Sequence, residues 1–409
     1  MLKTYLDTGA VNQCCGCGVC ADACPCTAIS LTDGKDKSKY PTIDLKACVN
    51  CGRCRIVCPI SSLPVCSDAI RQKAYVAVLE EETQRNKSAS GGAFEGIVAS
   101  LELVYSDLLV VGAVLSDDLS AVHDLRSAKR REAFKKSKYI QSNCVGIYKK
   151  VKTSLQNGKA VLFSGTPCHV AGVKRYLGKD YENLYTVDIV CHGVPGAGIF
   201  KHYINEIEER YHCKVLSAEF RHKKKDFYGE IHSNFLKLEL SSGKTIYRNN
   251  KTDEYLRGFH SALFYRESCY SCPFAKPERY GDITLGDYWN IQKIMPELVD
   301  YTGVSCVLVN TVKGEEMLCN ANSLLMKETE VDFLLKHNGQ LSAPSHCHKN
   351  RERFFAEFDK KSFGRLINEN VGRAKYFKNA VSRLLPGKLK RKMKKLILSK
   401  GIAKWMMQL

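Results

Sequence analysis

The sequence predicts a protein with α+β and α/β parts: a small cysteine-rich N-terminal domain, a central α/β domain with an antiparallel insertion, and a helical, basic C-terminal tail. Three observations predict this fold. Eleven of the 20 cysteines lie in the first 66 of 409 residues. From Ala74 onward, apolar runs alternate with amphipathic ones. Residues 371–409 contain 12 Lys or Arg and no Asp or Glu, so the tail accounts for most of the net charge of +19.

The cysteines are expected to work in a reducing compartment. The chain starts MLKTYLDTGAVNQ, without the apolar stretch of a signal peptide, and has no long apolar run that would predict a membrane span. A cytoplasmic location follows, where clustered cysteines bind metal more often than they pair with each other. The positive charge gathers in the tail, which lacks interleaved aromatic residues, so no nucleic-acid partner is expected.

Two cysteine runs in the N-terminal block share the spacing Cys-x2-Cys-x2-Cys-x3-Cys-Pro. Their cysteines are Cys14, Cys17, Cys20 and Cys24, and then Cys48, Cys51, Cys54 and Cys58. This is the bacterial-ferredoxin pattern, in which three thiolates of one run hold a 4Fe-4S cluster and the fourth reaches the other cluster. Zinc is the alternative, but zinc ribbons use separate Cys-x2-Cys pairs.

The pattern therefore assigns residues 1–66 to a ferredoxin-type domain with two clusters. The first cluster has the ligands Cys14, Cys17, Cys20 and Cys58, and the second has Cys48, Cys51, Cys54 and Cys24. Cys15, Cys26 and Cys66 lie outside the spacing and are expected to be bystanders. Because two clusters conduct single electrons without transforming a substrate, a further redox centre is expected downstream.

A polar stretch, residues 67–73, is predicted to be a linker into the central domain, residues 74–345. Its buried strands are predicted at 75–79, 108–115, 160–164, 184–191 and 304–310, and its helices at 93–105, 145–155, 170–177 and 314–325. Strands that alternate with helices favour a partly parallel sheet. Residues 231–240 and 245–248, joined by a Ser-Ser-Gly-Lys turn, predict an antiparallel insertion. After about Pro344 the chain reads as helical, with an extension at 346–387 and a basic tail at 388–409.

Four later cysteines come from three segments that the fold could bring together. Cys168 follows a predicted strand and opens a helix for which Thr166 is the N-cap and Pro167 the first residue. Cys191 also ends a predicted strand, so both would lie at one sheet edge. Cys269 and Cys272 form a Cys-x2-Cys-Pro pair. They could hold a third cluster; the alternatives are separate core thiols, or a nucleophilic Cys168 activated by the helix N-terminus.

Several segments together resemble the beta-subunit family of coenzyme F420-reducing hydrogenase and F420H2 dehydrogenase. In order, they are Ser90-Gly91-Gly92, Ser137-Lys138-Tyr139, Gly165-Thr166-Pro167-Cys168, Cys191-His192-Gly193-Val194-Pro195, Cys269-Tyr270-Ser271-Cys272-Pro273 and 281–289. The resemblance covers residues 1 to about 345. It implies FAD beside iron–sulfur clusters, and a cluster held by the same four later cysteines.

The flavin-binding residues rest on less specific signals. Ser90, Gly91 and Gly92 precede an apolar helix and could offer backbone N–H groups to a pyrophosphate. Lys138 could pair with a phosphate, and Thr166 could bond the flavin ring. The alternative is an ordinary capped turn.

The tail reads as a basic amphipathic helix. Apolar residues recur at Leu389, Met393, Leu396 and Ile397 among Lys and Arg, with Trp405 near the end. Such a helix could attach peripherally to the anionic inner face of a membrane. The alternative is a solvated or partner-bound helix.

These observations predict an iron–sulfur, flavin-dependent oxidoreductase of an anaerobe. Electrons from ferredoxin or a similar carrier would pass through the clusters to FAD, or in reverse, with hydride transfer to or from coenzyme F420 or another small molecule. A polysaccharide-biosynthesis intermediate is one such substrate. The alternative is a non-catalytic electron-transfer subunit of a larger redox complex. The sequence identifies no catalytic residue.

Overall fold

The computed structural model describes residues 3–64, 68–225, 231–293, 295–298 and 302–373. The expectations for the basic tail and for Cys66 therefore fall outside the described residues. Within the described part of the chain, no helix has the length and apolar character needed to cross a bilayer.

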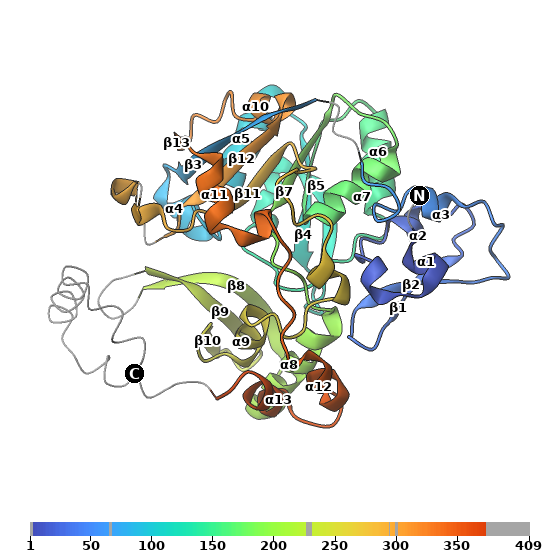
Figure 1. Cartoon of the computed structure of the whole chain (residues 1–409). Coiled ribbons are helices and arrows are strands. Elements are labelled where there is room, and N and C mark those ends of the chain that lie inside the picture. The colour runs from blue at the N-terminus through green and yellow to red at the C-terminus, as the bar shows by residue number, and fades with distance from the viewer. Residues whose placement is uncertain (1–2, 65–67, 226–230, 294, 299–301, 374–409) are drawn as a thin grey trace, which may run out of the picture.

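The N-terminal domain is ferredoxin-like, as predicted, and lies to one side of the molecule (Figure 1). Its short elements are α1 Tyr5–Thr8, α2 Val19–Ala23, β1 Ile29–Asp33, β2 Lys39–Ile43 and α3 Arg53–Ile56. Strands β1 and β2 pair antiparallel. Helices α2 and α3 each begin after a glycine with positive φ, Gly18 at 77° and Gly52 at 72°, a conformation that glycine adopts without steric cost.

A mixed sheet of eight strands forms the central domain, in the order β13-β3-β12-β11-β7-β6-β4-β5. The strands are β3 Ala69–Leu79, β4 Leu109–Leu115, β5 Ala121–Ser127, β6 Val161–Gly165, β7 Leu184–Ile189, β11 Ile283–Asp287, β12 Ser305–Thr311 and β13 Leu324–Thr329. Strands β4, β6, β7 and β11 pair in parallel, and the remaining pairs are antiparallel. The predicted partly parallel sheet is confirmed.

Helices cover both faces of this sheet. Leu162 of β6 packs with Ile97 of α5, whereas its neighbours Val161 and Phe163 pack on the opposite face with Val170 of α7. The helices are α4 Glu82–Lys87, α5 Ala93–Val104, α6 Ile147–Gln156, α7 Pro167–Leu177, α10 Val312–Glu316 and α11 Val331–His337. The N-terminal domain joins the face of α6 and α7, where Cys17 and Val19 enter the same core.

The insertion forms a second lobe below the large sheet in Figure 1. It contains β8 Val215–Lys225, β9 Ile231–Leu240 and β10 Thr245–Asn249, together with α8 Ala197–Tyr211, α9 Glu254–His260, α12 Arg351–Glu357 and α13 Phe363–Asn370. Its antiparallel order β10-β9-β8 confirms the predicted insertion. Aromatic side chains fill its core, including Phe200, Tyr255 and Phe264.

Two local predictions are wrong. The predicted linker is strand from Ala69 onward, because residues 69–73 pair with the end of β12. The helix predicted over 314–325 ends at Glu316, and Leu324 begins β13, which pairs with β3 along the sheet edge. In both places pairing with a distant strand overrides the local pattern.

Candidate metal and cofactor sites

Two cysteines of the first loop, Cys17 and Cys20, lie within electrostatic reach of Cys58. Contact with the Cys15 thiol lowers the pKa of Cys17, but burial and the nearby Cys58 and Cys20 raise it to about 11. Burial, Cys14 and Cys58 raise the pKa of Cys20 above its usual range. These thiols would repel each other when ionised, and a bound metal would favour their thiolate forms.

The second loop is more exposed than the first. Cys51 is exposed, and burial raises the pKa of Cys54, with a further rise from Cys51. Both Cys54 and Cys48 contribute to the raised pKa of Arg55, after the larger effect of Asp7, so the two cysteines lie near the same guanidinium. Cys20 also lies within electrostatic reach of Cys54, which brings the two loops together.

Cys24 and Cys26 lie beside the second loop. Their sulfur atoms are 3.7 Å apart, and the Cys24 sulfur accepts the backbone N–H of Ala28 at 3.2 Å. The backbone N–H of Val49, in the second loop, lowers the pKa of Cys26. Cys26 is thus close to the second site, which its sequence position did not indicate.

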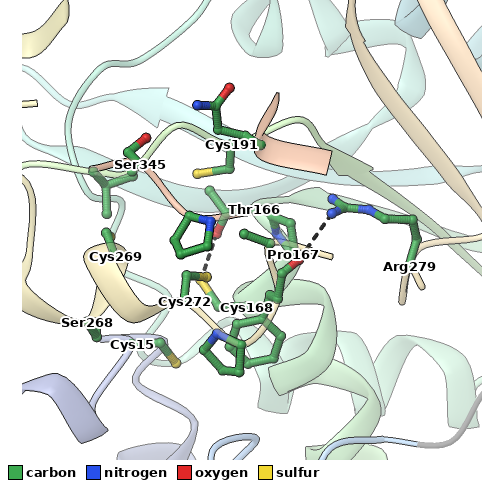
Figure 2. A pocket seen from close by; sticks show the side chains of 17 residues that line it. Cys15, Thr166, Pro167, Cys168, Cys191, Ser268, Cys269, Cys272, Arg279 and Ser345 are labelled. Atoms are coloured by element: carbon green, nitrogen blue, oxygen red, sulfur yellow. Dashed lines mark hydrogen bonds between the residues drawn. The ribbon is translucent and has the colours of Figure 1, made fainter. Parts of the chain in front are cut away.

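The four later cysteines line one pocket at the carboxyl ends of the parallel strands (Figure 2). Strands β6 and β7 pair in register from Val161 with Leu184 to Gly165 with Asp188, so Cys168 and Cys191 follow at the same edge. Backbone contact between Arg266 and Val194 brings the segment of Cys269 and Cys272 to them. The pocket encloses about 590 Å³, counting solvent at its mouth.

These four thiols form a donor set that fits a metal cluster. Burial and the nearby Cys168 raise the pKa of Cys191 to about 12 and that of Cys272 to about 11. Burial, Cys191 and Cys272 raise the pKa of Cys269 above its usual range. The thiols therefore resist ionisation in this apolar pocket unless a bound cation compensates their charge.

A fifth cysteine, Cys15, reaches the same pocket from the N-terminal domain. Its thiol contacts both Cys168 and Cys17, and it is buried, with 9% of its surface exposed. Cys15 thus lies between the first loop and the pocket, although it was expected to be a bystander. Only the docking of the two domains reveals this position.

The predicted flavin residues divide into two groups. Gly91 packs against strands, because a Cβ there would lie 2.5 Å from the Ala77 carbonyl oxygen. Ser90 donates its hydroxyl to the Val304 carbonyl at 3.0 Å, and Gly92 is the N-cap of α5, so these residues have structural roles. The Thr166 hydroxyl lies 3.0 Å from the Cys168 sulfur, within the cluster pocket.

Lys138 is a buried lysine bonded to backbone carbonyl oxygens. Its Nζ donates to the carbonyl oxygens of Ala133 at 3.1 Å and Lys135 at 2.7 Å, and in the described part of the chain no carboxylate pairs with it. Burial lowers its pKa to about 7, although Glu219 opposes that shift. A buried amine of this kind would be stabilised by a phosphate oxygen.

Strand β8 contacts the Ser90 turn, and its Glu219 acts electrostatically on Lys138. Its Arg221 is paired with Asp287 at the end of β11, over 2.7 Å, and donates to the Ala89 carbonyl at 2.9 Å. Lys223 donates to the Ser90 carbonyl at 3.0 Å. The two groups of predicted flavin residues are therefore joined through one strand of the insertion lobe.

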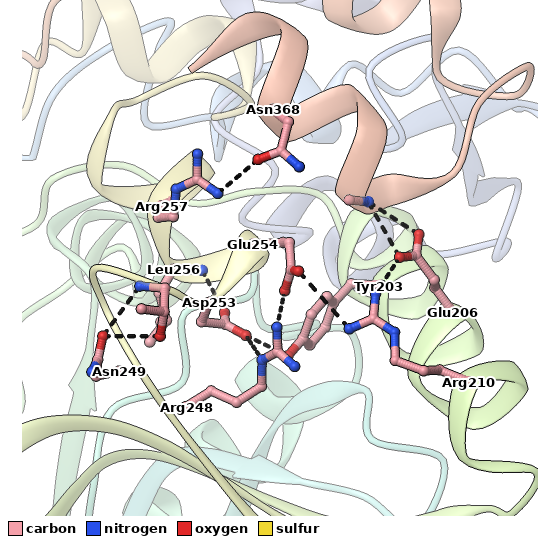
Figure 3. A network of polar contacts seen from close by, with 12 residues as sticks. Tyr203, Glu206, Arg210, Arg248, Asn249, Asp253, Glu254, Leu256, Arg257 and Asn368 are labelled. Atoms are coloured by element: carbon pink, nitrogen blue, oxygen red, sulfur yellow. Dashed lines mark hydrogen bonds and ion pairs between the residues drawn. The ribbon is translucent and has the colours of Figure 1, made fainter. Parts of the chain in front are cut away.

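A buried polar network holds that lobe together (Figure 3). The Asp253 carboxylate accepts from the Tyr203 hydroxyl at 2.6 Å, from Arg248 Nε at 2.9 Å and from the Leu256 backbone N–H at 2.8 Å. Asp253 thereby caps α9 and ties it to α8 and β10.

The comparisons with known proteins agree with this geometry. Residues 13–62 match the model of the 4Fe-4S dicluster domain. Residues 158–331 match the model of the C terminus of the coenzyme F420 hydrogenase/dehydrogenase beta subunit. The chain joins these two domains. The resemblance inferred from the motifs is confirmed, and the beta-subunit domain contains all four pocket cysteines.

The chain also resembles a chain from a xenon-derivatization structure of the F420-reducing NiFe hydrogenase complex of Methanosarcina barkeri. The two share 13% sequence identity over 74% of this chain and 92% of that one, with a TM-score of 0.41. No curated protein matches significantly.

Two buried histidines, His123 and His169, lie close to the pocket, since His169 directly follows the pocket residue Cys168. His123, Cys144 and His169 place one donor atom each within 4.8 Å of the others. The His123 ring is already bonded to the Ser142 hydroxyl at 2.8 Å and to the Ser164 carbonyl at 3.1 Å, so it is held as a core residue. Burial lowers its pKa to about 4.

Proposed function

We propose that this protein is an iron–sulfur flavoprotein oxidoreductase. Electrons would pass between the two clusters of the dicluster domain and FAD by way of a third cluster, and a hydride would move to or from coenzyme F420 or another small molecule. The observation that carries the proposal is the pocket that gathers Cys168, Cys191, Cys269 and Cys272 beside the dicluster domain.

The chain's own residues supply the ligands and the shape of these sites. Bound clusters would supply one-electron transfer, and bound FAD would supply the exchange between single electrons and a hydride. The four pocket thiolates would hold the third cluster. Pro167, Pro273 and Phe274 line the same pocket and give it apolar walls. Lys138 would hold an anionic part of the flavin.

The second loop offers an approach for an external electron carrier such as ferredoxin. Cys51 is exposed there, and so are the apolar side chains of Leu45, Val49 and Ile56. The first loop lies on the pocket side, through Cys15. These two observations support an order in which the second cluster would lie near the surface and the first would lie toward the third.

Anaerobic purification with iron, sulfide and flavin counts tests the proposal. Three clusters require about twelve irons per chain, with about one FAD. The double variant C269A/C272A should retain about eight irons. C319A, which changes an exposed cysteine far from the motifs, should retain the full count.

A second measurement separates an enzyme from an electron-transfer subunit. The purified chain, loaded with FAD and reduced, should reduce an added deazaflavin without another subunit. A chain that holds its clusters but no FAD would favour the electron-transfer alternative. Zinc in place of iron would overturn both.

A further inference from the structure

Arg266 is a buried cation whose direct hydrogen-bond partners include no carboxylate. In the chain it lies between α9 and Cys269, and 0% of its surface is exposed. Among the described residues, no carboxylate lies within ion-pair distance of its guanidinium. The nearest carboxylate that acts on its charge is Asp36, which accepts the Tyr40 hydroxyl at 2.9 Å and lies beyond ion-pair distance of the guanidinium. Because a buried charge is costly, the groups in direct contact with the guanidinium matter most.

The guanidinium is directed at the first cysteine loop. Its Nη2 donates to the Cys14 sulfur at 3.1 Å, and its Nε donates to the Cys14 carbonyl at 2.7 Å. Its Nη1 donates to the Lys39 carbonyl at 2.8 Å and to Gln141 Oε1 at 3.0 Å. The group also lies over the Tyr40 ring, 4.1 Å from its centre. These contacts leave the side chain one orientation.

The backbone of Arg266 belongs to the third pocket. Its N–H donates to the Val194 carbonyl at 2.8 Å, and its carbonyl accepts the N–H of Cys269 at 2.9 Å. Val194 and Cys269 both line the pocket. On the same boundary, the residue after Cys14 is Cys15, whose thiol contacts Cys168. One residue thus connects the first loop to the pocket.

We propose that Arg266 is a positioning residue that raises the reduction potential of the cluster held by Cys14 and fixes that cluster against the third pocket. The inference rests on the proposed function, because it takes Cys14 as a cluster ligand. Hydrogen bonds to cluster sulfur and an adjacent fixed positive charge both favour the reduced, more negative cluster. The transfer itself moves one electron from one cluster to the next and breaks no bond.

Within the described ranges, no buried arginine donates to a cysteine of the second loop as Arg266 does to Cys14. Arg55 is the arginine near Cys54 and Cys48, but it is paired with Asp7 and 45% of its side chain is exposed. Its charge is therefore largely neutralised and screened. The first cluster should have the higher potential of the two, so electrons that arrive at the exposed loop move inward toward the pocket.

Redox titration of the full chain, followed by electron paramagnetic resonance, tests this role. R266Q removes the positive charge and most of the hydrogen-bond donors. R266K retains a positive charge but lacks the planar guanidinium group that donates to several partners at once. R266Q should shift the N-terminal cluster held by Cys14 to a more negative potential and leave the other N-terminal cluster unchanged. The pocket cluster should shift less, in the same direction, because the Arg266 charge also acts on Cys168. R266K should give a smaller shift in the same direction. R55Q is the matched control and should shift neither N-terminal cluster appreciably.

The outcomes separate this inference from the proposed function. If the unmodified chain lacks the pocket cluster, the proposed function fails before any variant is made. If all clusters are present but their potentials do not change in R266Q, the role of Arg266 is refuted. If R266Q does not assemble its clusters, the potentials of R266K are measured instead, and unchanged potentials in R266K also refute the role of Arg266.

C15S should retain the full iron count and slow reduction of the pocket cluster.

Discussion

The carboxylate of Asp22, in α2 of the dicluster domain, accepts the backbone N–H of Gly146 at 2.6 Å. Its other oxygen accepts the N–H of Tyr148 at 3.1 Å. Both donors belong to the N-terminus of α6, where backbone N–H groups have no partner within the helix. One domain therefore caps a helix of the other, and their docking is specified by a hydrogen-bonded charge.

Removal of this interdomain cap should weaken the docking. D22A should lower the free energy of unfolding by about 1–2 kcal/mol, the usual cost of a lost N-cap. D22N should also destabilise the protein, because the amide NH2 group would face the backbone N–H of Gly146 or Tyr148, and two donors cannot bond each other. Denaturant titration measures the loss, and faster proteolysis between the domains should accompany it. D33A removes an exposed ion pair with Lys39 and should change stability by less than about 1 kcal/mol.

Gly196 allows the same two domains to approach closely. A Cβ on this residue would lie 2.1 Å from the Lys37 carbonyl oxygen and 2.5 Å from the Ser38 nitrogen, and backbone atoms cannot yield as a side chain can. G196A should therefore displace the dicluster domain and cost roughly 1–3 kcal/mol of stability. G339A, where a Cβ meets nothing within 4 Å, is the control. Equal stability of the two variants would contradict the close contact.

The sequence predicted which cysteines lie near one another better than it predicted the domain interface. Motif spacing placed Cys14, Cys17 and Cys20 with Cys58, and the ends of adjacent parallel strands placed Cys168 near Cys191. Both depend on short-range geometry. Arg266 and Cys15 acquire their roles from contacts between domains, which no local pattern records. For the same reason Leu324 was assigned to a helix, since its strand partner β3 is remote in sequence.

A buried ion pair holds the pocket closed on one side. Arg279 Nη2 donates to Asp188 Oδ1 at 2.8 Å, and their side chains are 1% and 0% exposed. Because R279M would leave the Asp188 charge buried without its partner, it should cost about 3–5 kcal/mol. It should also reduce the occupancy of the cluster held by Cys272, measured as iron per chain. The double variant D188L/R279M should recover part of the stability.

The buried His123 makes stability depend on pH. Its pKa is about 4 in the folded protein, since burial disfavours the charged ring, against about 6.5 in the unfolded chain. Between these values the unfolded chain binds the extra proton, so stability falls as pH falls. From pH 7 to 5.5 the loss attributable to His123 should be about 1 kcal/mol. H123Q should lose less over this interval, and an equal loss in both proteins would refute the assignment.

Lys138 should make flavin binding depend on pH. Its pKa of about 7 in the flavin-free protein means that the amine is mostly charged below pH 7 and mostly neutral above it. An anionic ligand binds the charged form, so FAD affinity should fall as pH rises above 7, by up to roughly tenfold per unit. Fluorescence titration of the flavin-free protein at pH 6.5 and 8.5 measures this change.

Two substitutions separate charge from packing at this position. K138R keeps its charge at both pH values, so its FAD affinity should vary little between them. K138Q should bind weakly at both. K159Q removes an exposed lysine that pairs with Asp107, and its pH dependence should match that of the unmodified chain. If K138R retained the full pH dependence, the titrating group would lie elsewhere, and Lys138 would not be the residue that holds the anion.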